Sequence, residues 1–85
     1  MKAEDIIRIV ESDNPHMDKF FRFDLGTPIP VIGIIVKGED YDRLKKSNIW
    51  RVVTEADIIA WLKTHDLKLT ELIHGKLIAN ISIYN

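Results

Sequence analysis

The sequence predicts an α+β domain in which a small, mostly antiparallel sheet of about four strands carries two helices packed on one face. Two segments, one at the N-terminus and one after residue 54, repeat apolar residues at steps of three and four, as amphipathic helices do. The other apolar segments are rich in Ile, Val or Phe, or alternate apolar with polar residues, as strands do. The 85 residues suit one globular domain, 1–85, in the order helix, strand, strand, strand, helix, strand. A small curled, barrel-like sheet with helices is the alternative.

The first helix is expected over residues 2–13, because its apolar residues form one stripe. They are Ala3, Ile6, Ile7 and Val10. Pro15 disfavours the helical conformation of Asn14. The run 12–15 is therefore expected to end the helix near Asp13 and to turn the chain.

The first strand is expected over residues 20–25, with Phe21 and Phe23 pointing inward. The next, over 29–37, is rich in Ile and Val, which is typical of a central strand buried on both faces. Pro30 lacks a backbone donor, so pairing is expected to begin near Val31, and Gly33 is expected to mark a bulge or a close packing point.

The polar segment 37–48 is expected to connect this strand to the next, over 49–53, as a hairpin with a long connection. Thr54 is then expected to cap a helix that runs to about His65, with Asp57 completing a capping box. The apolar stripe of this helix is predicted from Ile58, Ile59 and Leu62, with Trp61 beside Ile58.

The last part of the chain is expected to turn and then form a strand. Residues 66–75 predict a turn, or one helical turn ending at Gly75. Residues 77–84 then alternate as a strand does. One face is predicted to hold Leu77, Ala79, Ile81 and Ile83, and the other Ile78, Asn80, Ser82 and Tyr84.

Composition excludes several classes of protein. The 12 basic and 13 acidic residues argue against a dedicated polyanion binder, and without cysteine there is no disulfide or thiolate zinc site. The longest run without charges, 25–36, is too short to span a membrane, and acidic residues near the N-terminus do not fit a secretory signal. We therefore expect a cytoplasmic protein that makes no membrane contact.

Catalytic and metal-binding patterns are not found in the sequence. The hydroxyl residues lack a GxSxG elbow, and the glycines form no phosphate-binding loop. The carboxylates of 38–42 do not follow the spacing of a calcium loop. The histidines His16, His65 and His74 fit no zinc pattern, and we interpret His65 and His74 as helix-end and turn residues. We expect no enzyme, no cofactor and no metal site.

The leading functional hypothesis is a small protein-interaction module, with self-association as one way to cover its surplus apolar surface. The predicted faces turn four large residues away from the first core, namely Phe20, Ile78, Trp61 and Tyr84. Ordinary burial of both sheet faces would account for the same residues without a partner.

The alternative is a nucleic-acid-binding domain that uses the basic loop 43–51. Its candidate contacts are Lys37, Arg43, Lys45, Lys46, Trp50 and Arg51. Cations would contact phosphates and an aromatic ring would stack on a base, as in single-strand recognition. In a competing interpretation, the acidic residues 39–42 neutralise these cations and Trp50 lies in the core.

Overall fold

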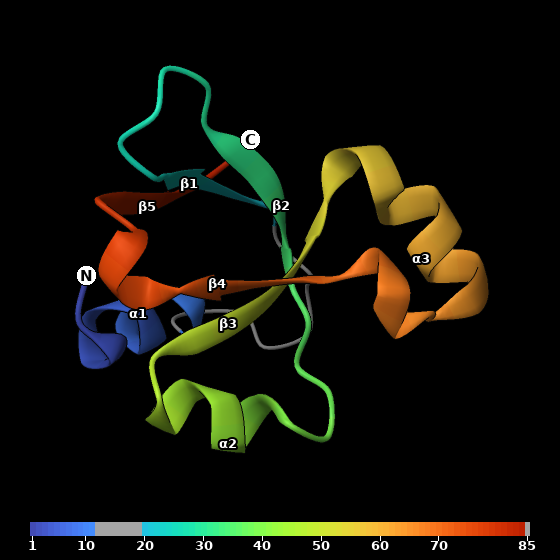
Figure 1. Cartoon of the computed structure of the whole chain (residues 1–85), viewed down its shortest axis with the longest axis horizontal. Coiled ribbons are helices and arrows are strands. Elements are labelled where there is room, and N and C mark those ends of the chain that lie inside the picture. The colour runs from blue at the N-terminus through green and yellow to red at the C-terminus, as the bar shows by residue number, and fades with distance from the viewer. Residues whose placement is uncertain (12–19, 85) are drawn as a thin grey trace.

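The structure, a computed structural model, describes residues 1–11 and 20–84 and is a five-stranded antiparallel sheet with helices (Figure 1). The helices are α1 (Ala3–Val10), α2 (Tyr41–Lys46) and α3 (Ile58–Thr64), with single 3₁₀ turns η1 (Glu55–Asp57), η2 (Leu67–Leu69) and η3 (Gly75–Leu77). The strands are β1 (Phe21–Asp24), β2 (Val31–Ile35), β3 (Ile49–Thr54), β4 (Glu71–His74) and β5 (Asn80–Ile83). The strand order is β4-β3-β2-β1-β5, so the α+β prediction is confirmed and the sheet stays open between β4 and β5.

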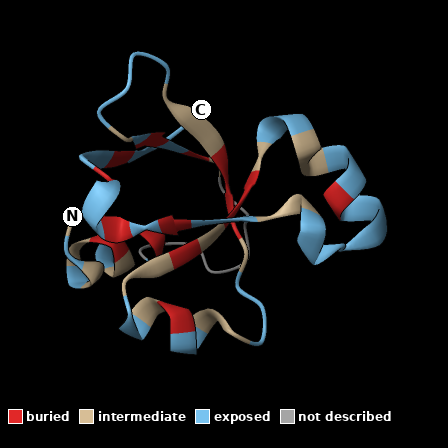
Figure 2. Ribbon diagram, in the orientation of Figure 1, coloured by how far each residue is buried: buried red, intermediate tan, exposed pale blue. Residues whose placement is uncertain are grey.

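Alternation along the central strands divides the apolar residues between two sheet faces. The larger cluster comprises Ile6, Val10, Phe21, Phe23, Ile35, Trp50, Val52, Ile73, Ile78 and Ile81. The smaller comprises Ile34, Val53 and Trp61. Neighbouring residues of β2 and of β3 thus point to opposite faces. Figure 2 shows the buried positions gathered where these strands cross.

The helices cover both faces of the sheet. Helix α1 packs Ile6 and Val10 into the larger cluster, and Tyr41 of α2 packs against the same cluster. Helix α3 places Trp61 in the smaller cluster instead. The prediction of two helices on one face is therefore wrong, because β2 and β3 are apolar on both sides and each side needs cover.

The predictions for the first three strands are confirmed. Phe21 and Phe23 are buried, pairing of β2 begins at Val31, and β2 is the middle strand. Gly33 is a close packing point, because a Cβ there would overlap the backbone carbonyl of Val53 on β3. The first helix is described to Val10, with Glu11 at its C-cap, and the predicted stop at 12–15 lies outside the described residues.

One strand and one helix were not predicted. Residues 71–74 form β4 rather than a turn, since they pair with β3 from Val52↔Glu71 to Ile49↔His74. Their apolar spacing resembles a helix, and the pairing with β3 overrides it. The polar connection also contains α2, in which Leu44 is the buried residue.

Local details of two other predictions were wrong. Thr54 caps η1 and makes no side-chain capping bond, so the chain enters α3 through a 3₁₀ turn without a capping box. The last strand begins at Asn80, because η3 interrupts the alternation that was expected from residue 77. Consequently Ile78 is buried, whereas Leu77 is exposed.

Asn48 joins three parts of the chain. Its backbone carbonyl accepts from the amide of Gly75, and its side chain accepts from the Trp50 indole and donates to the carbonyl of Met1. The N-terminal ammonium in turn donates to the carbonyls of Gly75 and Ile78. The start of the chain is thereby bound to the link between β4 and β5.

None of the helices in residues 1–11 and 20–84 has the length and apolar character needed to cross a bilayer.

Replacing Gly33 by Ala tests the close approach of β2 and β3. The added methyl would overlap the Val53 carbonyl, so we expect the free energy of unfolding in urea to fall by about 1 to 3 kcal/mol. The control is Gly38→Ala, whose Cβ would meet the Val36 side chain at an ordinary 3.8 Å. Equal stability of both variants would contradict the proposed packing.

Candidate functional site

The six residues predicted as a basic surface do not share one surface. Alternation along β3 turns Trp50 into the larger cluster and Arg51 to the face of α3. Trp50 is 1% exposed and its indole donates to Asn48 Oδ1 at 2.9 Å. In this conformation its ring has no free face on which a base could stack.

Lys45 lies in a network of acidic and aromatic groups. Its Nζ lies 3.0 Å from Glu11 Oε2, 3.3 Å from Asp42 Oδ1, and 4.9 Å from the centre of the Tyr41 ring. The Tyr41 hydroxyl also donates to Glu11, and this bond together with Lys45 lowers the pKa of the Glu11 carboxyl. These contacts join the end of α1 to α2.

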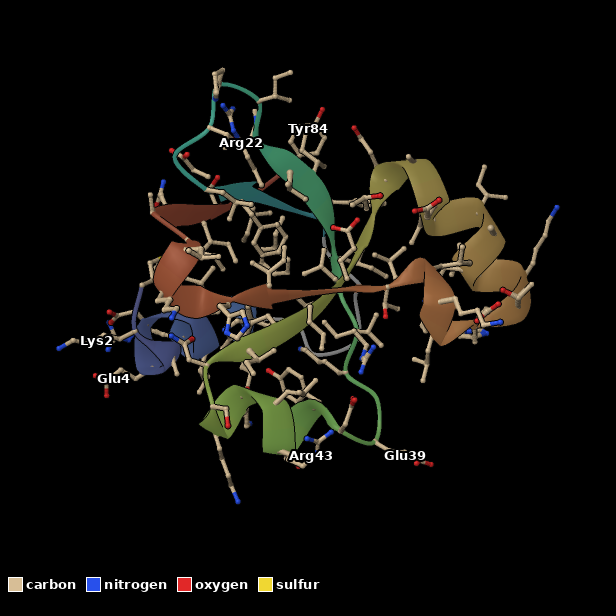
Figure 3. All side chains as sticks on the ribbon, in the orientation of Figure 1. Lys2, Glu4, Arg22, Glu39, Arg43 and Tyr84 are labelled. Carbon is tan, nitrogen blue, oxygen red and sulfur yellow. The ribbon has the colours of Figure 1, made fainter. Side chains whose placement is uncertain are left out.

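The other cations of α2 reach outward. Arg43 is exposed, with its Nη2 at 3.9 Å from Asp40 Oδ2, and Lys46 is also exposed. Figure 3 shows Arg43 and Glu39 at the same end of the molecule, beside α2. The predicted pairing of the acidic run with the basic run is therefore present at Asp40, Asp42 and their partners.

Lys37 and Arg51 both contribute to the lining of a groove between the segment after β2 and the end of α3, although the Lys37 ammonium points to α1, where it donates to the Val10 carbonyl at 3.4 Å. The groove has a volume of about 720 Å³, within the range of known ligand-binding pockets. Its lining comprises Ile34, Ile35, Val36, Lys37, Gly38, Glu39, Asp40, Arg51, Trp61, His65 and Leu67. Apolar side chains from β2 and α3 make up part of the lining, and charged side chains form one wall.

Arg51 is held firmly in that wall. Its Nη2 lies 2.7 Å from Asp40 Oδ2, and its Nη1 donates to Thr70 Oγ1 at 2.7 Å. The hydrogen bond from Arg51 lowers the pKa of the Asp40 carboxyl, while partial burial opposes this effect. Arg51 Nε is buried without a partner among the described residues. The guanidinium therefore joins β3 to the segment before α2 and to the residue before β4.

The opposite wall is formed by the end of α3. The ring of His65 meets that of Trp61 edge-on, with centroids 5.1 Å apart. His65 itself ends the helix with a left-handed backbone, φ 51°, which directs the chain into η2. Leu67 follows, lining the groove while remaining 58% exposed.

Beside the groove, α3 presents apolar side chains to solvent. Ile59 and Leu62 lie three residues apart on one helix face and are 68% and 59% exposed. Both were predicted to lie in the buried stripe, but in α3 the buried residue is Trp61 and Ile58 is half-buried. The helix contacts the sheet through Trp61 and Ile58, so Ile59 and Leu62 have no cover within the described chain.

The four residues predicted as surplus apolar surface differ in how far they are buried. Ile78 and Trp61 are buried, Phe20 packs partly against the smaller cluster, and Tyr84 is 45% exposed. Sequence reasoning missed the groove. The one local signal was the spacing of Trp61 and His65, four residues apart on one helix face, and it does not by itself indicate a groove.

The histidines form no cluster in the described structure. His65 ends α3 and His74 ends β4, so they lie at opposite ends of the stretch containing η2 and β4, and His16 lies outside the described residues. Residues 1–11 and 20–84 contain no group of three or more His, Asp or Glu side chains placed to hold a metal ion.

Comparisons with family models, with curated proteins and with solved structures find no match for this chain.

Replacing Asp40 by Asn tests the groove wall. Because the folded state lowers the pKa of Asp40, the ion pair contributes fully above the unfolded value of about 3.9 and is lost as pH falls through the folded value. We expect Asp40→Asn to reduce the free energy of unfolding at pH 7, and the difference from wild type to shrink in acid. The control is Glu39→Gln, at an exposed neighbour. A difference independent of pH would contradict this role of the ion pair.

Proposed function

We propose that this chain is a small, non-catalytic protein-interaction module of the cytoplasm, and that its partner binds over α3 and the adjacent groove. The observation that supports this proposal is the exposure of Ile59, Leu62 and Leu67 beside a groove with partly apolar lining. Exposed apolar patches rimmed by polar groups are typical of protein-binding surfaces.

The chemistry of the groove suits one large apolar side chain of a partner. Trp61 and Ile34 provide apolar lining, and the Arg51–Asp40 ion pair provides a polar rim. Binding sites often combine a buried apolar anchor with such a rim. Because Arg51 is already paired with Asp40, a neutral anchor is favoured over an anionic one.

The nucleic-acid alternative receives less support from the geometry. It needs an accessible ring and several free cations on one face. Trp50 is buried, and Lys45 and Arg51 are bound to carboxylates. We therefore place the partner-binding surface on the α3 side.

Selection from a random peptide display library tests the proposed surface. We expect enriched peptides to carry apolar anchors and to shift the amide resonances of α3, η2 and residues 36–40. Leu62→Lys should weaken their binding by about tenfold or more, since burying the new ammonium is costly.

The matched control is Leu77→Lys, which alters an equally exposed leucine on η3, away from the groove. It should leave peptide affinity unchanged. Since both leucines are exposed, neither variant should unfold the domain. Peptides that bind both variants equally, or that map elsewhere, would refute this surface.

A titration with a generic single-stranded oligonucleotide separates the two candidate functions. We expect the amide resonances of residues 43–51 to stay unshifted, because the cations there are mostly paired and Trp50 is buried. Shifts that weaken steeply with salt and vanish when Lys45 and Lys46 are both changed to Glu would support nucleic-acid binding instead.

A further inference from the structure

The sheet ends in two edge strands that differ in chemistry. Strand β4 pairs with β3 and strand β5 pairs with β1, and no described strand lies on the outer side of either (Figure 1). Open edges present unpaired backbone groups that can pair with another chain. Each edge strand is therefore expected either to carry features that discourage such pairing or to pair with another chain.

Strand β4 carries the features that protect an edge. The charged residue Glu71 begins the strand, and the charged residue Lys76 follows it in η3. Charged residues on an edge strand discourage pairing, since a partner strand would have to desolvate them. By contrast, residues 77–84, which contain β5, have no charged side chain, no Pro and no Gly. Strand β5 is the unprotected edge.

The backbone of β5 has a defined free side. The amide of Tyr84 donates to the carbonyl of Phe20, and the strand is paired in register from Phe21↔Ile83 to Asp24↔Asn80. Bonds to a neighbouring strand alternate along an antiparallel ladder, so Ser82 also bonds toward β1 while Ile81 and Ile83 turn their backbone groups outward. The N-terminal ammonium donates a hydrogen bond to the Ile78 carbonyl, so this carbonyl is not available to a partner strand. The free part of the edge therefore begins after Ile78.

Two exposed side chains, one on β5 and one directly after it, lie at the end of the same edge. Ile83 is 44% exposed on the side of the larger cluster, and Tyr84 is 45% exposed on the other side. Figure 3 shows Tyr84 at the end of the molecule opposite Arg43 and α2. An added strand would cover both residues, since neighbouring strands bring side chains together on each face.

We propose that two copies of this chain associate through antiparallel pairing of their β5 strands, with Ser82 opposite Ser82 of the second copy. In this register Ile81 of each copy exchanges backbone hydrogen bonds with Ile83 of the other. On the other face, Tyr84 lies opposite Asn80 of the second copy. The two sheets then form one continuous sheet across a twofold axis.

A second copy is the favoured occupant because the strand is suited to pairing with itself. Two identical strands carrying charge would repel each other in a symmetric register, and β5 carries none. The same register places polar Ser82 and Asn80 against uncharged groups and covers Ile83 of both copies. This proposal does not depend on the groove or on α3.

A cysteine at position 82 tests the register directly, because the chain has no cysteine of its own. Opposed residues in a non-hydrogen-bonded antiparallel pair have Cα atoms about 4.5 Å apart, which permits a disulfide. We expect Ser82→Cys to form a covalent dimer in air about tenfold faster, or more, than Ser47→Cys, an exposed control at the C-cap of α2 that reacts by collision.

A second substitution in the Ser82→Cys protein separates edge pairing from other association. Adding Ile83→Lys should reduce the rate of cross-linking to that of the Ser47→Cys control, since it places a charged side chain on the pairing strand of each copy. Adding Leu77→Lys, also exposed but outside β5, should leave the rate unchanged.

Sedimentation of the wild-type protein completes the test. Mass that rises with concentration in wild type, and falls to the monomer in Ile83→Lys, would support the proposal. Equal cross-linking of Ser82→Cys and Ser47→Cys would overturn it, as would a dimer that Ile83→Lys leaves intact. Such a failure would leave the proposed function of the α3 surface untouched, because that surface is tested with Leu62→Lys.

Discussion

The pairing of β2 with β3 is the constraint on which the rest of the structure depends. Ile34 and Val53 point to one face, whereas Ile35 and Val52 point to the other, so this pair supplies apolar surface to both sides of the sheet. The two backbones approach closely enough at Gly33 that no side chain fits there. A sheet with two apolar faces needs cover on both, which explains why α1 and α2 lie on one face and α3 on the other.

The two faces are covered unequally, and this difference gives rise to the candidate site. Helix α1 buries Ile6 and Val10 against seven apolar residues of the strands and Ile78 of the β4–β5 link. The cover on the other side consists mainly of Trp61, with Ile58 and Leu69 beside it. Because α3 reaches the sheet only through Trp61 and Ile58, its side chains Ile59 and Leu62 stay in solvent and a groove remains beside Trp61. The site is thus a consequence of how a short helix covers a small cluster.

Sequence patterns predicted the elements whose burial follows a simple period. Phe21 and Phe23 alternate with polar neighbours, and Ile6 and Val10 share a helical stripe, so their burial could be inferred. Strand β4 could not be inferred in this way, since Leu72 and Ile73 are adjacent and only the partner strand decides which one is buried. The groove also escaped prediction, because Arg51, Asp40 and His65 come from three separate segments and meet only through the fold.

Charge patterning explains why the loop that stands out in the sequence does not stand out in the structure. Asp40 and Asp42 precede the cations Arg43 and Lys45, and short helical turns bring such residues within reach of one another. Arg51, from the following strand, also pairs with Asp40. Acidic and basic residues that are separated along the chain therefore neutralise one another in the folded structure. The two surfaces that we propose for contact with other chains, namely the exposed apolar residues of α3 and the uncharged edge of β5, lie outside this charged segment. Neither surface is marked by a motif, because an exposed apolar residue differs from a buried one only in where the fold places it.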